Sequence, residues 1–153
     1  MARISVQTPD FDIGAEFAAL TAGRADIGGI GCFVGTVRAD AGDRVAAMTL
    51  EHYPAMTERS IAHVTDEAER RWQLLGCTVI HRVGRLTAGE NIVLVLAAAS
   101  HRQPALDATA FLIDWLKTKA PFWKLEETPA GEKWVGAHEG DDAAAARWEK
   151  KSQ

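Results

Sequence analysis

The stretch NIVLVLAAA, residues 91–99, is apolar at every position after the first. A run that is apolar on both of its alternating faces is typical of a strand buried in the middle of a sheet. The preceding stretch CTVIHRVG, residues 77–84, predicts a neighbouring strand, and RLTAGE, residues 85–90, predicts the turn between the two. After the run, Pro104 suits the first turn of a helix that continues to about Lys119.

The rest of the chain supplies further strands and one more long helix. Residues 57–75 form the clearest amphipathic pattern, in which apolar residues such as Ile61 and Val64 recur at helical spacing. Asp12 is expected to cap a short helix that ends near Thr21. Further strands are expected at residues 3–8, 28–38, 46–53, 122–127 and 133–137. This order of elements predicts an α+β fold in which two long helices pack on the sheets.

Length and composition limit the class of protein. A length of 153 residues suits a single domain, 1–153, in which residues 140–153 are expected to form a loose helix or a frayed tail. Cys32 and Cys77 lie far apart and have no ligand spacing, so we expect free thiols in a reducing compartment and no bound metal. The N-terminus lacks an apolar signal core and no apolar run approaches about 20 residues, so we expect a cytoplasmic protein that does not span a membrane.

Charge is distributed unevenly along the chain. The net charge is -4, which argues against a general nucleic-acid binder. Residues 81–124, by contrast, carry six Lys or Arg against three acidic residues and also contain His81 and His101. A local cationic region on an acidic protein favours a small anionic ligand over a long polyanion.

The stretch LKTKAPFWKLEE, residues 116–127, sets aromatic residues among lysines at a corner of the chain. Lys117 is expected in the last helical turn and Lys124 in the strand after the corner, so both ammonium groups can lean over one pocket walled by Phe122 and Trp123. Two cations close together in a partly dry site favour loss of a proton from one of them, which would supply a nucleophile or general base. The alternative is that these lysines only complement the helix dipole, which we favour for Lys119.

Other polar side chains offer weaker signals. His101 and Arg102 come at the start of the second long helix, where free N–H groups suit a phosphate or carboxylate, although a surface pair is the alternative. Arg38 ends the glycine-rich strand and is by itself compatible with an ordinary exposed arginine. His81 is interpreted as a satisfied core or interface histidine rather than a ligand.

Several of these segments together resemble one family, the large catalytic subunit of molybdopterin synthase. The matching blocks, in the family's order, are FVGTVR (33–38), MTLEHYPAMTE (48–58), VIHRVG (79–84), SHR (100–102) and LKTKAPFWKLE (116–126). The resemblance covers the chain from about residue 27 to Trp148. It implies an α/β hammerhead fold with an additional antiparallel β-sheet.

The resemblance also implies an activity and partners. Members of this family are sulfurtransferases of molybdenum cofactor biosynthesis that convert cyclic pyranopterin monophosphate (precursor Z) to molybdopterin. The dithiolene sulfurs arrive as a thiocarboxylate on the C-terminal Gly-Gly of a small ubiquitin-like partner subunit. The large subunit forms a homodimer and, with a small subunit at each end, a heterotetramer. No cofactor is implied.

Site residues carried over from the family fall on the same segments. Lys117 matches the family's essential lysine and Lys124 its second active-site lysine. The residues that match anion-binding or substrate-binding positions are Arg38, His101 and Arg102, and those expected near the partner's tail are Phe33 and Phe122. His138 stands where the family often has an arginine that reaches across the dimer, so its charge would depend on pH.

A second class of function remains open at this point. The chain would instead be a non-catalytic scaffold that binds the ubiquitin-like sulfur carrier or an anionic pterin. Such a scaffold would tolerate Lys117→Ala with little loss of function, whereas the enzyme would not.

Overall fold

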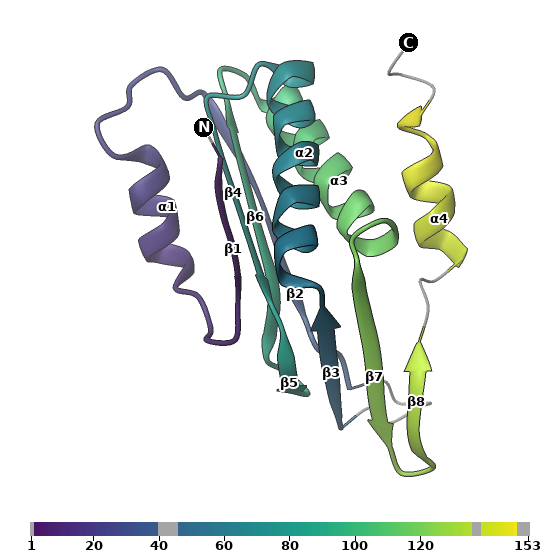
Figure 1. The fold of residues 1–153 in the computed structure, drawn as a ribbon. Coiled ribbons are helices and arrows are strands. Elements are labelled where there is room, and N and C mark those ends of the chain that lie inside the picture. Colours follow the sequence, from purple (N-terminus) through teal and green to yellow (C-terminus); the bar gives the residue numbers. More distant parts are fainter. Residues whose placement is uncertain (1, 40–45, 136–138, 150–153) are drawn as a thin grey trace.

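A computed structural model describes residues 2–39, 46–135 and 139–149 of the chain (Figure 1). Its strands are β1 (Arg3–Gln7), β2 (Gly29–Thr36), β3 (Ala47–His52), β4 (Gly76–Arg82), β5 (Gly84–Thr87), β6 (Asn91–Ala99), β7 (Phe122–Thr128) and β8 (Gly131–Val135). Its helices are α1 (Ile13–Thr21), α2 (Pro54–Trp72), α3 (Arg102–Thr118) and α4 (Glu139–Ala146).

The first sheet has the strand order β1-β4-β6-β2. Strand β6 lies inside it, antiparallel to both β4 and β2, and all of its residues after Asn91 are buried. The prediction of a central strand at residues 91–99 is therefore confirmed. The apolar residues on both faces of β6 require a layer of helices on each side of this sheet.

Helices cover the two faces of the first sheet unequally (Figure 1). On one face, α2 packs against β1 and β4, and α3 packs against β2 and β6. Ile61 of α2 and Leu112 of α3 are fully buried in this main core. On the other face, α1 packs against β4 and β6, and the side chain of Asp12 accepts a hydrogen bond from the Ala15 amide at its start. The predicted cap is thus confirmed.

The second sheet has the order β5-β3-β7-β8 and is antiparallel where its strands pair. Figure 1 shows that β3 leads directly into α2 and that β7 follows α3, so this sheet extends from the ends of the two long helices. Two sheets with α2 and α3 packed on them confirm the α+β fold.

The interpretation of RLTAGE as a turn was wrong in its first half. Gly84–Thr87 forms β5, which pairs with β3 and places Leu86 opposite Met48. The strand has only one buried side chain, Leu86, so it shows no alternating pattern to recognise. Gly84 has a φ of +89°, which lets the chain leave β4 and turn at once into the second sheet.

Gly31 in β2 and Gly28 just before it allow α3 to lie very close to the first sheet. A Cβ atom placed on Gly31 would come 2.1 Å from Thr109 Oγ1 and 2.6 Å from the Ala105 carbonyl oxygen, both on α3. A Cβ on Gly28 would come within 1.9 Å of the Ser100 carbonyl oxygen, just before α3. The glycines therefore hold the start of α3 against β2, and this fixes where the far end of the helix lies.

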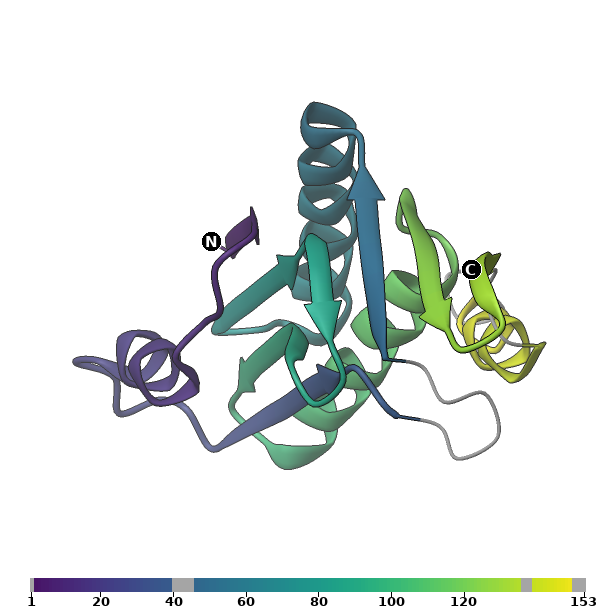
Figure 2. The ribbon, with the colours of Figure 1, turned by 90° about the horizontal axis from the view of Figure 1, so that it is seen from below.

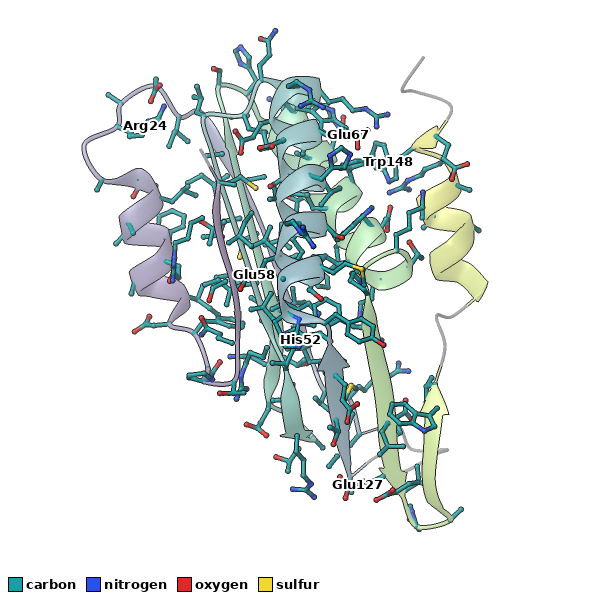
Figure 3. All side chains as sticks on the ribbon, in the orientation of Figure 1. Arg24, His52, Glu58, Glu67, Glu127 and Trp148 are labelled. Atoms are coloured by element: carbon teal, nitrogen blue, oxygen red, sulfur yellow. The ribbon has the colours of Figure 1, made fainter. Side chains whose placement is uncertain are left out.

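The C-terminal segment contains α4, which packs on α3. Trp148 follows α4 and is buried, and its indole Nε1 donates a 2.7 Å hydrogen bond to Asp114 Oδ2 of α3 (Figure 3). Its ring also meets the rings of Trp72 and Phe111 edge-on, with centroids 5.6 and 5.8 Å away. Across the described ranges, no helix is both long enough and apolar enough to cross a lipid bilayer.

Candidate active site

Lys117 and Lys124 line one small cavity, at the place where the two sheets meet. The cavity has a volume of about 20 Å³, which is room for about one water molecule. Its lining residues are Leu50, His81, Ile92, Val93, Ile113, Leu116, Lys117, Phe122 and Lys124. The expected corner therefore does bring the last turn of α3 and the start of β7 together over one site.

The strand register explains why Phe122 and Lys124 share this site. In β7 they stand opposite His52 and Leu50 of β3, and residues two apart in a strand point to the same face. Leu50 is almost fully buried, so this face of the second sheet is turned toward the core. Phe122 lines the cavity, as the sequence predicted, whereas the side chain of Trp123, the second predicted wall, lies outside the described part of the structure.

Lys119 lies elsewhere. Its side chain is exposed and its ammonium group pairs with Glu149 Oε1 at 3.2 Å. It lines a different cavity, of about 310 Å³, between α2, α3 and the C-terminal segment, together with Trp115 and Trp148. The preference for a structural role at Lys119 agrees with this placement.

Three aromatic rings stack beside the lysines. The His81 and Phe122 rings have centroids 3.9 Å apart and planes 17° from parallel, and the His52 and Phe122 rings have centroids 6.3 Å apart and planes 7° from parallel. Figure 3 labels His52 where β3 approaches the start of α2. The stack therefore joins β4, β7 and β3 at the cavity.

His81 is a buried, neutral histidine. Its Nδ1 lies 2.8 Å from the Arg82 carbonyl oxygen, to which it donates a hydrogen bond. Burial is the main cause that lowers the pKa of His81 to about 4; the positive charges of Lys117 and Lys124 contribute to this shift, whereas the hydrogen bond to the Arg82 carbonyl opposes it. The interpretation of His81 as a satisfied core histidine is confirmed.

Sequence reasoning nevertheless missed that His81 lines the lysine cavity. The available signal was the alternation in VIHRVG, which places His81 on the same face of β4 as the fully buried Val79. That face packs against the helix layer that carries Lys117.

Arg38 and Phe33 belong to β2 and to the segment that follows it. Phe33 is half-buried and stands opposite Val95 of β6. Arg38 is exposed, just beyond the end of β2. In β6, the cavity residue Val93 pairs with Gly35, so the end of β2 that leads to Arg38 lies at the same end of the first sheet as the lysines.

His101 and Arg102 lie at the opposite end of α3. Both are exposed, and His101 occupies the N-cap position without a side-chain capping bond. Arg102 and Lys117 are 15 residues apart on one helix, which corresponds to about 22 Å along its axis. A single chain therefore does not bring these cations to the lysine cavity. His138 lies outside the described residues.

Cysteine and metal chemistry find little support in the described part of the chain. Cys32 is exposed and Cys77 is buried, and both are free thiols. Burial raises the pKa of Cys77 to about 12, so this thiol stays protonated. No group of three His, Cys, Asp or Glu side chains within the described ranges is arranged to hold a metal ion. The cavity instead offers two ammonium groups, an aromatic face and a neutral imidazole.

Comparisons with known proteins agree with one another. The family model described as "MoaE protein" matches residues 6–119. A relative from Ralstonia nicotianae, named molybdopterin synthase catalytic subunit, is 51% identical over 149 residues, which is 97% of this chain and 85% of the relative. The corresponding Escherichia coli relative, of the same name, is 48% identical over 147 residues and covers 95% of this chain and 97% of its own.

A solved structure also matches nearly the whole chain. The structure titled "Molybdopterin biosynthesis MoaE protein" from Burkholderia ambifaria is 53% identical, with a TM-score of 0.83, and the match covers 97% of this chain and 99% of that one. Sequence and fold thus point to the same relatives across all the elements that build the lysine cavity. The chain belongs to the MoaE protein family.

Proposed function

We propose that this chain is the catalytic subunit of a molybdopterin synthase. It converts cyclic pyranopterin monophosphate to molybdopterin, using sulfur delivered as the C-terminal thiocarboxylate of a small ubiquitin-like partner subunit. Membership of the family supports this reaction. The structural observation that carries it is the meeting of Lys117 and Lys124 in one partly buried cavity with Phe122.

The cavity suits the charges of such a reaction. A thiocarboxylate and a phosphorylated pterin are both anionic, and ammonium groups in a place with little water bind anions more strongly than they do in bulk solvent. In this proposal the thiocarboxylate sulfur bonds to the pterin, and water then adds to the partner's acyl carbon. Negative charge develops on the acyl oxygen in that addition, before the carbon–sulfur bond breaks and leaves the sulfur on the pterin and a carboxylate on the partner, and fixed cations stabilise that charge. Lys117 is proposed to perform this role, with Lys124 as the second cation. The sulfur comes from the partner, so neither cysteine of this chain has to relay it.

The partner's tail has an approach route in this proposal. Phe122 lines the cavity, and Phe33 lies on β2, the edge strand of the first sheet. We assign both residues to the binding of the tail. Arg38 follows β2 at the same end of the sheet and is assigned to the substrate.

The remaining cations require a second copy of the chain. His101 and Arg102 lie about 22 Å along α3 from Lys117, a span longer than a pterin monophosphate. We propose a homodimer in which the start of one α3 reaches the lysine cavity of the other chain. His138 is assigned to the same substrate from the segment after β8. With one small subunit per chain, the assembly is a heterotetramer.

The proposed functional unit is one domain comprising the whole chain, residues 1–153, acting in the cytoplasm. The two free cysteines of the structure fit a reducing compartment. The proposal includes no cofactor.

A reconstituted reaction tests the proposal. The purified chain is mixed with the small partner subunit carrying a C-terminal thiocarboxylate and with cyclic pyranopterin monophosphate, and the dithiolene product is measured by mass spectrometry. Product is expected with the wild-type chain and not when the partner ends in an ordinary carboxylate. Binding of both ligands by the wild-type chain without product would identify a scaffold instead of an enzyme.

A further inference from the structure

The lysine cavity has a single hydrogen-bond acceptor among the side chains that line it. Its other lining side chains are aliphatic, aromatic or lysine. A lysine ammonium donates hydrogen bonds and accepts none, whereas a neutral imidazole has one acceptor nitrogen. His81 is therefore the side chain in the lining that can hold an ammonium group by a hydrogen bond.

The backbone determines which nitrogen of His81 is that acceptor. Nδ1 lies 2.8 Å from the Arg82 carbonyl oxygen, so the proton of the neutral ring is on Nδ1. The lone pair is then on Nε2. Stacking on Phe122, with ring centroids 3.9 Å apart, keeps the imidazole from turning away. The ring is thus fixed both in tautomer and in orientation.

Several titratable side chains face His81, from three elements around it. These are Lys117 of α3, Lys124 of β7 and His52 of β3, and among them Lys117 contributes most to lowering the pKa of His81 after burial itself. On its own strand, the guanidinium of Arg82 is bound to the carbonyl oxygens of Thr8 and Asn91. Within the described ranges, the side chain of Lys117 makes no hydrogen bond or ion pair with another residue. Lys117 is therefore the group that His81 is best placed to hold.

We propose that His81 is a positioning residue, whose neutral Nε2 is linked to the Lys117 ammonium by hydrogen bonds through the one water for which the cavity has room. These bonds orient Lys117 toward the bound substrate. Because His81 stays neutral, it adds no third positive charge to the cavity. This inference rests on the proposed synthase activity and adds a residue to its machinery.

Two substitutions at His81 separate positioning from folding. The amide of His81→Asn ends at the level of Nδ1, so it can donate to the Arg82 carbonyl but supplies no acceptor at the position of Nε2. The amide of His81→Gln extends to the level of Nε2, so it supplies the acceptor but loses the bond to Arg82. A structural role predicts that His81→Asn is the better enzyme. A positioning role predicts the reverse.

The expected results can be stated for each variant. Loss of a hydrogen bond to a charged group lowers a rate or equilibrium constant by a factor of about 10 to 100. His81→Asn should therefore lose about 10- to 100-fold in kcat with a much smaller change in KM, while its thermal unfolding stays close to wild type. His81→Gln should melt at a lower temperature and yet turn over several-fold faster than His81→Asn. Assays run below the melting temperature of each variant. If activity follows stability across the two variants, the positioning role is wrong.

A spectroscopic measurement on chains that keep His81 does not depend on how the His81 variants fold. The 15N resonance of His81 Nε2 reports whether that atom accepts a hydrogen bond. It should shift markedly in Lys117→Met and much less in Lys124→Met, which serves as the matched control. If the Nε2 resonance does not shift in Lys117→Met, or shifts only in Lys124→Met, His81 does not hold Lys117 and the positioning role is wrong. Turnover of the wild-type chain in the same preparation tests the synthase activity separately. Product without the expected response of Nε2 contradicts only the positioning role of His81, whereas absence of product contradicts the proposed activity.

Discussion

The ring of His81 stacks on the ring of Phe122 with centroids 3.9 Å apart, although the two residues belong to different sheets. His81 lies in β4 of the first sheet and Phe122 begins β7 of the second. The stack therefore connects the two sheets at the wall of the lysine cavity. Since β7 also carries Lys124, the distance between the two lysines depends on this contact between the sheets.

The three lysines of LKTKAPFWKLEE should differ sharply in their importance. Lys117→Ala should lower turnover by about 100-fold or more, since it removes a cation from the reacting site. Lys124→Ala should weaken substrate binding, turnover or both. Lys117→Arg should not restore activity, because a guanidinium has a different shape and keeps its proton. Product formation and partner affinity are measured for each variant.

Lys119→Ala is the control for this series. It removes only an exposed ion pair with Glu149, which is worth at most about 1 kcal/mol. Its activity should stay within about twofold of wild type. If Lys119→Ala is inactive while Lys117→Ala keeps its activity, the site has been assigned to the wrong face of α3.

Stability should depend on pH through His81. Its pKa is about 4 in the folded chain and about 6.5 when exposed, so the unfolded state binds more protons between these values. The free energy of unfolding should therefore rise with pH from about 4 to about 6.5, by about 3 kcal/mol from this residue. Urea unfolding at several pH values measures this change in the free energy of unfolding. His81→Asn is the control, and an identical pH dependence in that variant would contradict the assignment.

Gly31→Ala should destabilise the fold and disturb the distant lysines. The new Cβ would meet Thr109 Oγ1 at 2.1 Å and the backbone oxygen of Ala105 at 2.6 Å. Overpacking of this kind costs about 1–3 kcal/mol. Adding Thr109→Ala removes the first clash but not the second, so the rescue should be partial. Chemical denaturation measures the cost, and full recovery in the double variant would show that the backbone contact is unimportant.

The chain should be a homodimer whose two sites share residues. At micromolar concentration, sedimentation should give twice the monomer mass without the partner subunit. The exposed Trp134, on the hairpin of β7 and β8, is expected in or near the interface. Figure 2 shows this hairpin at the opposite end of the molecule from α1. A monomer under these conditions would count against the shared site.

Mixing two inactive variants tests the sharing directly. If α3 of each chain serves both sites, Lys117→Ala and Arg102→Ala chains that exchange partners should form mixed dimers with one intact site. Activity should then reappear on mixing, although neither parent is active. No recovery, in dimers shown by mass spectrometry to be mixed, would place Arg102 outside the site.

The two cysteines should differ in reactivity and neither should be needed for turnover. Iodoacetamide should label the exposed Cys32 and leave Cys77 unmodified in the folded chain, because burial raises the pKa of the Cys77 thiol to about 12. Cys32→Ser with Cys77→Ala should keep most of the activity, which is measured in the reconstituted reaction. Loss of turnover in a folded double variant would mean that sulfur passes through this chain.

The elements that the sequence predicted well are those with strong local patterns. The central strand at residues 91–99 and the cap at Asp12 need no information from distant residues. Strand β5 was missed because it exists only by pairing with β3. The start of α2 was placed too late, because Pro54 ends a strand and begins a helix at once.

For the site, the sequence predicted part of the arrangement that the structure shows. The corner at Pro121 was enough to bring Lys124 back toward Lys117. The distance of His101 and Arg102 from the lysines follows from the predicted helix, but the sequence of one chain does not show which other residues these two side chains meet. His81 was recognised as a core residue, but its contact with Phe122 joins two sheets and leaves no local trace in the sequence.

The close packing of α3 on β2 has a consequence for insertions and deletions. One end of α3 is held by the glycines of β2, while the other presents Lys117 to the cavity. Losing a single residue between these points would rotate Lys117 by about 100° and withdraw it by about 1.5 Å. The helix can therefore accept many changes of side chain, but its length in residues is fixed by the chemistry at its far end.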